Sequence, residues 1–395
     1  AWPIVQSRVT LGADQLPRIT SGSGWPMTQR DTQRTGVSPD SITPPLSLAW
    51  AHATGSTFGF NSPIVVGDTV YTSVDNNDEP LRPTPVVLTL DAATGARRWA
   101  YELAGKSVRG GLAGSAEAIY ALADTGTLLA LDPANGELLW ERSELVADPV
   151  WKEMYNGAPA LDGSTVVAGA GAALAAWDAR DGSLRWKTSV VSEGGRRWTP
   201  NPAPALIDGR VLLAWDNLHS LSQETGEEQW VREHQYILTF SPTVSDDKVL
   251  MVVLRPDEDR FSHNRLLAAM DVTTGEQLWT VPMVTSQRGI YTSPVATDDR
   301  VYAFDDRNLY AIDLQSGKVL WQLELPQADV VTGSAALAGD HLYFVQSSGL
   351  ISVVNVVTQQ IVWSYDLGAR VDSSPAVSGN ALYVAARDGT LYAFV

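Results

Sequence analysis

The sequence predicts an all-β fold, an eight-bladed β-propeller of four-stranded antiparallel blades. Two short phrases alternate along the chain and predict it, one ending in tryptophan and the other centred on proline. The tryptophans recur about every 45 residues, a period typical of propellers and solenoids rather than of unrelated domains. Each period holds short apolar runs for four strands, which is the content of one propeller blade.

The first phrase is a tight turn followed by a strand that carries the tryptophan. Its seven copies are LDAATGARRW (90–99), LDPANGELLW (131–140), WDARDGSLRW (177–186), LSQETGEEQW (221–230), MDVTTGEQLW (270–279), IDLQSGKVLW (312–321) and VNVVTQQIVW (354–363). The aspartate can accept hydrogen bonds from turn amides, and the glycine tolerates a positive φ. In two copies Ser222 and Asn355 replace the aspartate and Gln359 replaces the glycine, which predicts altered turns in blades four and seven.

The tryptophans of this phrase fall on the strand after the turn, where a large flat ring can wedge against the neighbouring blade. An eighth tryptophan ends the run PLSLAW without the turn before it. We therefore expect a structural role for Trp50, Trp99, Trp140, Trp186, Trp230, Trp279, Trp321 and Trp363.

The second phrase predicts two strands joined by a tight turn, as in NSPIVVGDTVY at 61–71 and SSPAVSGNALY at 373–383. Eight copies occur, and Leu112 and Ala335 stand in two of them where the others have proline. Alternating Val, Ile, Leu and Tyr around GD, DG, DD or GN is typical of a hairpin. No stretch has a convincing 3.6-residue apolar period, so we expect almost no helix.

The ends of the chain predict how the ring closes. After Trp363 the sequence supplies three strands of a last blade, and PLSLAW at 45–50 supplies the fourth. Pairing the two ends would hide edge strands that invite aggregation. We divide the chain into an N-terminal extension, 1–45, and the eight-bladed propeller, 46–395.

Composition excludes several classes of function. A formal charge of −17 and a pI near 4.6 argue against a nucleic-acid binder. The absence of cysteine removes thiolate metal sites and cysteine nucleophiles. The apolar runs are too short for a transmembrane segment, so any membrane association would be peripheral. We expect a monomer that binds a protein or peptide partner.

The repeated A-x-D-x-x-T-G-x-x-x-W core resembles the PQQ-like β-propeller repeat, over roughly residues 46–395. Within that superfamily, chain length and repeat layout resemble the BamB branch, the non-enzymatic propellers of outer-membrane β-barrel assembly. That resemblance implies an exported scaffold that lies outside the cytoplasm, in the periplasm or cell envelope, with a signal peptide that is absent from this chain. It assigns no catalytic, cofactor or metal residue.

Two alternatives stay open beside the scaffold. The first is a PQQ- or metal-dependent oxidoreductase, because quinone-dependent dehydrogenases share the repeat. In that branch the resemblance implies a quinone between a tryptophan and a disulfide, together with Ca²⁺, and this chain has no cysteine. The second alternative is a ligand-sensing ectodomain.

The candidate partner site is the mouth of the central channel, where long, dissimilar loops lead from one blade into the next. Arginines and aromatic residues recur in these loops, which indicates a site for anionic or extended peptide partners. The candidate residues are Arg109, Tyr155, Asn156, Arg196, Arg197, Trp198, Arg288, Tyr291, Arg370 and Asp372. The alternative is that the arginines merely pair with nearby carboxylates such as Asp372.

Acidic stretches at 75–80, 255–260 and 304–308 raise the possibility of calcium binding. None has the regular ligand spacing of a calcium loop. We interpret them as solvated turns between the second and third strands of their blades.

Overall fold

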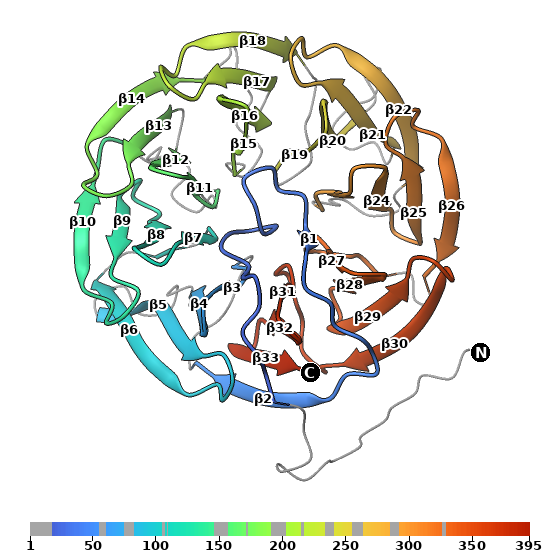
Figure 1. Ribbon diagram of the computed structural model, residues 1–395, viewed down its shortest axis with the longest axis horizontal. Helices are drawn as coiled ribbons and strands as arrows, with labels where there is room; N and C mark the ends of the chain where they lie inside the picture. Colours follow the sequence, from blue (N-terminus) through green and yellow to red (C-terminus); the bar gives the residue numbers. More distant parts are fainter. Residues whose placement is uncertain are drawn as a thin grey trace.

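The computed structural model describes residues 18–54, 61–74, 83–104, 107–108, 110–145, 157–170, 173–190, 203–214, 217–233, 241–254, 264–284, 292–325 and 329–395. These residues form eight sheets arranged in a ring around one axis (Figure 1). Every regular element among them is a strand, and each sheet contains four antiparallel strands, to which one sheet adds a short parallel fifth strand. The predicted all-β, eight-bladed propeller is confirmed.

Each blade runs from an inner strand near the axis to an outer strand at the rim (Figure 1). Blade 1 contains β3 (Ile64–Val66), β4 (Thr69–Ser73), β5 (Pro83–Asp91) and β6 (Arg97–Ala104). Blade 2 contains β7 (Leu112–Gly114), β8 (Ile119–Leu122), β9 (Leu128–Leu131) and β10 (Leu138–Arg142). Blade 3 contains β11 (Ala160–Asp162), β12 (Thr165–Ala170), β13 (Ala173–Asp178) and β14 (Leu184–Ser189). Blade 4 contains β15 (Ala205–Ile207), β16 (Arg210–Ala214), β17 (Asn217–Ser222) and β18 (Glu228–Glu233).

The second half of the ring repeats this layout. Blade 5 contains β19 (Thr243–Ser245), β20 (Lys248–Leu254), β21 (Asn264–Asp271) and β22 (Gln277–Val284). Blade 6 contains β23 (Val295–Ala296), β24 (Arg300–Phe304), β25 (Asn308–Asp313) and β26 (Val319–Glu324). Blade 7 contains β27 (Ala336–Ala338), β28 (His341–Val345), β29 (Leu350–Asn355) and β30 (Gln360–Asp366), and β1 (Val37–Ser38) joins it beside β27. Blade 8 contains β31 (Ala376–Ser378), β32 (Ala381–Ala385), β33 (Thr390–Phe394) and β2 (Leu48–Ala53).

The last blade closes the ring by joining the two ends of the described chain. β2 pairs antiparallel with β33, placing Trp50 opposite Ala393 and Leu48 opposite Phe394. Reciprocal backbone hydrogen bonds between Ser47 and Val395, at 2.7 and 2.9 Å, extend the pairing by one residue. The closure predicted from PLSLAW is therefore present.

The core lies between successive sheets. Inner strands such as β15 and β19 are wholly buried, whereas the outer β14 alternates exposed residues with the buried Trp186. Where blades 2 and 3 face each other, Trp140 packs with Val166 and the fully buried Trp177. Alternation along the outer strands thus directs one tryptophan per blade into an interface between blades.

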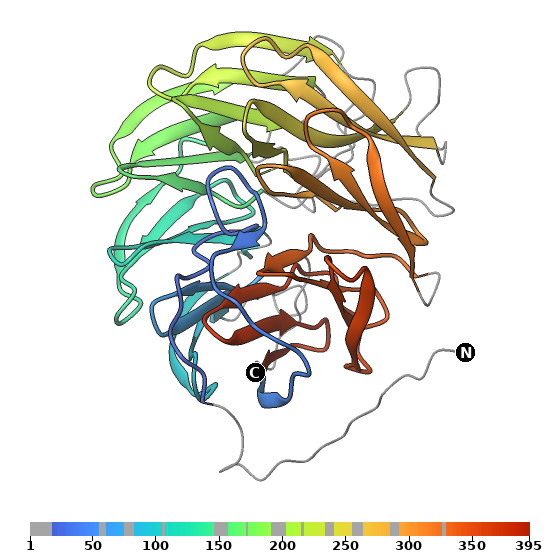
Figure 2. The ribbon, with the colours of Figure 1, turned by 45° about the vertical axis from the view of Figure 1, so that its right-hand side comes forward.

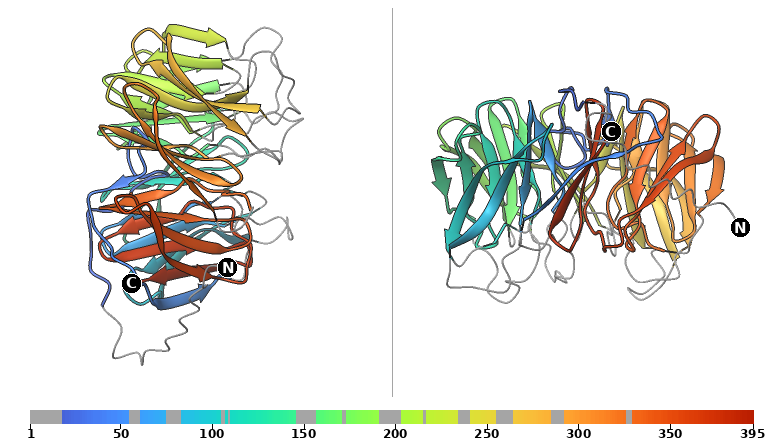
Figure 3. Two further views of the ribbon diagram at one scale, coloured as in Figure 1. Left: turned by 90° about the vertical axis from the view of Figure 1, so that its right-hand side faces the viewer. Right: turned by 90° about the horizontal axis from the view of Figure 1, so that it is seen from below.

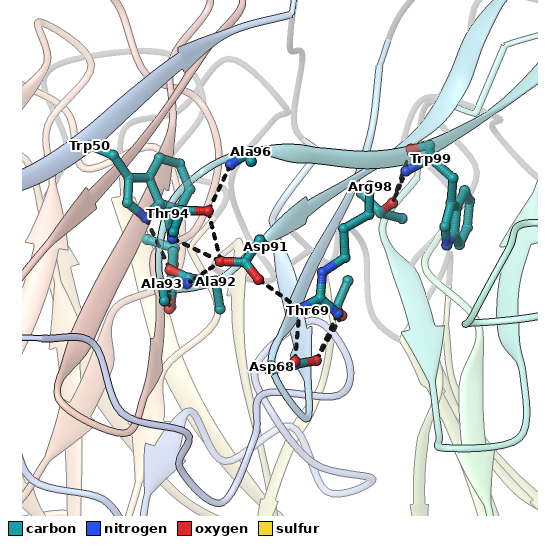
Figure 4. A network of polar contacts seen from close by, with 12 residues as sticks. Trp50, Asp68, Thr69, Asp91, Ala92, Ala93, Thr94, Ala96, Arg98 and Trp99 are labelled. Atoms are coloured by element: carbon teal, nitrogen blue, oxygen red, sulfur yellow. Dashed lines mark hydrogen bonds and ion pairs between the residues drawn. The ribbon is translucent and has the colours of Figure 1, made fainter.

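In the five blades whose phrase contains an aspartate, that side chain accepts hydrogen bonds from the amides of the turn before the tryptophan strand, as Figure 4 shows for blade 1. In blade 1, Asp91 Oδ1 accepts hydrogen bonds from the amides of Ala93 and Thr94, at 3.1 and 2.9 Å, and from the Thr94 hydroxyl at 2.8 Å. Gly95 follows with a φ of +69° and donates its amide to the carbonyl of Asp91. These are the roles predicted for the aspartate and the glycine.

The prediction of altered turns in blades 4 and 7 was wrong. Gly226 donates its amide to Ser222 O and Gln359 donates to Asn355 O, both at 2.8 Å, as in blade 1. Asn355 Oδ1 also accepts the amides of two following residues, because an amide oxygen can replace a carboxylate in this role. Gln359 adopts a φ of +59° where the other copies have glycine.

The N-terminal segment 18–47 crosses the end of the ring before it reaches β2 (Figures 1 and 2). Its strand β1 lies parallel to β27, with Val37 opposite Leu337. The segment is therefore packed against the propeller from residue 18 onward, although none of it belongs to the repeat.

Candidate functional site

The two ends of the ring differ in what lies over the axis. Hairpin turns between the first and second, and third and fourth, strands of each blade lie at one end, which we call the turn end. The first and third strands of each blade begin at the opposite end, which we call the loop end. Segment 18–47 lies over the turn end only (Figure 3).

At the turn end this segment pairs with inner strands of successive blades. Trp25 and Val65 of blade 1 exchange two backbone hydrogen bonds, at 2.8 and 2.9 Å, and Gly114 of blade 2 donates to Pro26. Further round the ring, inner-strand amides donate to the segment's carbonyls: Leu206 to Thr32, Val244 to Gln33, Ala296 to Thr35 and Leu337 to Gly36, at 2.7 to 3.0 Å. Without the segment these inner edges would expose unpaired amides.

Two polar side chains of segment 18–47, those of Gln29 and Arg34, are buried against the propeller. Arg34 is fully buried and donates to the carbonyls of Thr28, Pro159 and Pro204, at 2.6, 3.1 and 3.1 Å. Burial lowers the pKa of Arg34 to about 10, and the nearby Asp31 opposes part of that shift. Gln29 donates to the carbonyls of Arg34 and Pro294, at 3.1 and 3.3 Å.

The prolines of the repeat explain why these side chains find acceptors. A proline has no amide hydrogen, so at that position the inner edge of a blade offers only its carbonyl. Arg34 and Gln29 together use the carbonyls of Pro159, Pro204 and Pro294, from blades 3, 4 and 6. The chain itself therefore covers the axis at the turn end.

Near the loop end, hydrogen bonds between serine residues connect neighbouring blades. Each precedes the proline position of its blade, and from blade 6 onward its hydroxyl accepts a hydrogen bond from the amide of the serine in the blade before. The pairs are Ser241 to Ser293, Ser293 to Ser334, Ser334 to Ser374 and Ser374 to Ser62, at 2.9 to 3.1 Å. The last pair connects blade 8 to blade 1, where the ring closes. Side-chain hydrogen bonds therefore link the inner ends of blades 5, 6, 7, 8 and 1 in sequence.

Of the candidate mouth residues, Arg370 and Asp372 lie in the described part of the chain. The remaining candidates, which lie outside it, are Arg109, Tyr155, Asn156, Arg196, Arg197, Trp198, Arg288 and Tyr291. Convergence of these loops around one opening therefore stays a prediction.

Asp372 lies at the loop end of blade 8, and its side chain is 0% exposed. Arg370 Nε lies 3.1 Å from Oδ1 of Asp372, and Arg387 Nε lies 2.5 Å from Oδ2. The Arg387 amide also donates to the Arg370 carbonyl at 2.7 Å, which holds the two segments side by side. Two arginines therefore share one buried carboxylate.

The sequence reasoning missed Arg387, Gln29 and Arg34. Arg387 occupies the turn between the second and third strands of blade 8, where blades 2 and 7 carry Asp124 and Ser347. Comparing that turn between repeats would have drawn attention to it. Gln29 and Arg34 lie outside the repeat, where no periodic comparison is possible.

The acidic stretch 304–308 is a turn, but not a solvated one as predicted. Asp305 is 3% exposed and accepts the amides of Arg307 and Asn308, both at 2.8 Å. The Tyr310 hydroxyl donates to the same carboxylate at 2.6 Å, and burial raises the pKa of Tyr310. The stretches at 75–80 and 255–260 lie outside the described residues.

The described residues contain no group of three or more histidine, aspartate or glutamate side chains placed to hold a metal ion. They also contain no helix long and apolar enough to cross a membrane.

The sequence matches the family described as "Outer membrane protein assembly factor BamB" over residues 47–214, 191–333 and 327–395. These matches cover every blade of the ring. The chain belongs to this family.

Individual relatives are distant but span most of the chain. The outer membrane protein assembly factor BamB of Burkholderia pseudomallei is 26% identical over 86% of this chain and 85% of its own length. The crystal structure of BamB from Moraxella catarrhalis superposes with a TM-score of 0.66 at 16% identity, covering 88% of this chain and 99% of that one. The quinohemoprotein alcohol dehydrogenase of Comamonas testosteroni superposes equally well, with a TM-score of 0.67 at 18% identity, over 94% and 80%. At such identities the superpositions show a shared fold.

Proposed function

We propose that this protein is a non-enzymatic scaffold of the cell envelope that binds protein partners during outer-membrane protein assembly. Family membership carries the proposal, because the match to the BamB family covers all eight blades. In this proposal the protein acts outside the cytoplasm as a monomer, and its partner surface is the loop end.

The geometry supports the loop end as the partner surface. The turn end is covered by Gln29, Arg34 and the backbone that carries them, and this backbone accepts hydrogen bonds from inner-edge amides of blades 1, 2, 4, 5, 6 and 7. At the loop end, Arg370 and Arg387 are exposed beside the serine residues that connect neighbouring blades by hydrogen bonds. Binding residues are commonly placed on loops that a rigid scaffold positions.

The decisive experiment is deletion of the gene in its native organism, followed by quantitation of β-barrel proteins in purified outer membranes. We expect their amounts to fall and to recover when the wild-type gene is restored. Unchanged amounts in the deletion strain would overturn the assembly role.

The oxidoreductase alternative shares the fold with the Comamonas enzyme and is tested separately. The purified protein is incubated with PQQ and Ca²⁺ and assayed for alcohol and sugar oxidation with a dye acceptor. We expect no turnover above a boiled control. Turnover that depends on both additions would overturn the non-enzymatic assignment.

A further inference from the structure

The arginines of this structure differ in which nitrogens are engaged. Both terminal nitrogens of Arg98 bond the carboxylates of Asp68 or Asp91, at 2.7 to 2.8 Å. All three nitrogens of Arg34 bond backbone carbonyls. Arg370 and Arg387 instead contact Asp372 through Nε alone.

Within the described ranges, no hydrogen bond or ion pair engages Nη1 or Nη2 of Arg370 or Arg387. The two side chains are 59% and 42% exposed, while the carboxylate that anchors them is wholly buried. Two cations on one anion leave one net positive charge, although the chain as a whole carries −17.

The backbone that carries the pair is tied down on several sides. Arg387 donates its amide to Arg370 O, and Val371 donates to Ser347 O of blade 7 at 3.2 Å. The Thr332 hydroxyl donates to Val371 O at 2.7 Å, and the Ser373 hydroxyl donates to Ala385 O at 2.8 Å. Both guanidinium groups are therefore held at Nε on a fixed support, which lowers the entropy lost when a ligand binds.

Nearby acidic side chains accept hydrogen bonds from backbone amides. Asp366 accepts the amide of Gly368 and Asp388 accepts that of Thr390, each at 2.9 Å. Asp329 accepts the amides of Val330 and Ser348, both at 2.8 Å. Within the described ranges these carboxylates form no ion pair with Arg370 or Arg387.

We propose that Arg370 and Arg387, anchored on Asp372, form a binding site for a carboxylate of a peptide partner. A guanidinium group held at one nitrogen presents its remaining donors in a planar fork that fits the two oxygens of a carboxylate. The site deepens the proposed function and rests on it, since it names which chemical group of a partner the loop end binds. The carboxylate belongs either to Asp and Glu side chains or to a peptide C-terminus.

The test measures fluorescence anisotropy with three labelled peptides and the full-length protein. The first is a capped hexaglutamate with an amidated C-terminus, the second a Gly/Ser peptide with a free C-terminus, and the third the same Gly/Ser peptide amidated. We expect one of the first two to bind more tightly than the third, which identifies the source of the carboxylate.

Four variants then locate the binding. Arg370→Gln and Arg387→Gln should each weaken binding about tenfold or more, the effect of losing a charge-assisted hydrogen bond. The matched control is Arg300→Gln at the turn end, because Arg300 is 40% exposed and also contacts a carboxylate, that of Asp299, through Nε. It removes the same charge and should change the affinity less than twofold. The double variant Arg370→Lys/Arg387→Lys keeps the charge and should still bind more weakly than the wild type.

Two outcomes would overturn the proposal. Equal affinity for all three peptides would mean that no carboxylate is recognised. Equal weakening by Arg300→Gln and by the two loop-end variants would mean that only overall charge matters. Neither outcome touches the assembly role, which the outer-membrane quantitation tests without reference to these arginines.

Discussion

The indole ring of Trp50 lies directly against Gly95 of the next blade, with no space for a side chain between them. A Cβ atom at Gly95 would lie 2.6 Å from the ring. The same contact joins Gly136 to Trp99, Gly182 to Trp140, Gly226 to Trp186, Gly275 to Trp230 and Gly317 to Trp279. In these pairs a Cβ atom added to the glycine would lie 2.5 to 2.7 Å from the ring. In five of these pairs, all but that of Trp230, the indole Nε1 also donates to a carbonyl of that turn, as Trp50 does to Ala92 O at 3.0 Å. One glycine and one tryptophan therefore link each of these blade pairs.

Substitution at this contact should be costly. Gly95→Ala forces a side chain into the ring and into a φ of +69°, so we expect a loss of roughly 2–4 kcal/mol in unfolding free energy. The matched control is Gly67→Ala, where φ is +61° but nothing lies within 4 Å of the added carbon. Its cost should be about 1 kcal/mol, from the backbone alone. Chemical denaturation of both variants measures the difference, and equal losses would show that the ring contact contributes nothing.

Arg34 should be essential for closing the turn end. Arg34→Met leaves the carbonyls of Thr28, Pro159 and Pro204 without their donor, so we expect a loss of about 3 kcal/mol or more in unfolding free energy. Arg30→Met in the same segment removes a partly exposed ion pair with Asp31 and should cost less than about 1 kcal/mol. Thermal unfolding of the two variants provides the comparison. A larger loss for Arg30→Met would contradict the role given to Arg34.

Truncation separates the segment over the axis from the strand that closes the ring. Deletion of residues 1–45 keeps β2 but removes every backbone hydrogen bond between residues 24–36 and the inner strands. We expect a lower melting temperature and a tendency to associate, because the inner edges become unpaired. Deletion of residues 1–17 serves as the control and should leave the melting temperature unchanged. A 46–395 fragment as stable as the full chain would mean that the segment does not stabilise the ring.

The ion pairs of Arg98 predict how stability responds to acid. Hydrogen bonds from Arg98 hold the pKa of Asp68 and of Asp91 below the usual value of 3.8. A carboxyl group whose pKa is lower in the folded state stabilises the fold above the unfolded value, and this contribution is lost as the pH falls through the folded value. We expect the wild-type melting temperature to fall more between about pH 5 and pH 3 than that of Arg98→Gln. Parallel pH profiles for the two proteins would contradict this account.

Much of the fold follows from the sequence because the information is local and repeated. Strand alternation, the Asp-to-Gly turn and the tryptophan spacing each act within one blade or between adjacent blades, so a period of about 45 residues determines the architecture. Blades 4 and 7 show how far this extends. Ser222, Asn355 and Gln359 depart from the phrase, yet their turns keep the same backbone hydrogen bonds, because neighbouring strands hold the turn in place.

Only the tertiary structure determined which side chains meet at the two ends of the ring. Gln29 and Arg34 have no counterpart in the repeat, and their acceptors lie 125 to 265 residues away along the chain, at Pro159, Pro204 and Pro294. The sequence suggested that Arg370 either binds a partner or pairs with Asp372. The structure shows that Arg370 contacts Asp372 through Nε and that Arg387 contacts the same carboxylate through its own Nε. The sequence determined the blades because the interactions of the repeat act within one blade or between neighbouring blades. The contacts of Arg34 and Arg387 depend on the closed ring, because only the ring brings these side chains close to partners that are distant in the sequence or lie on another segment.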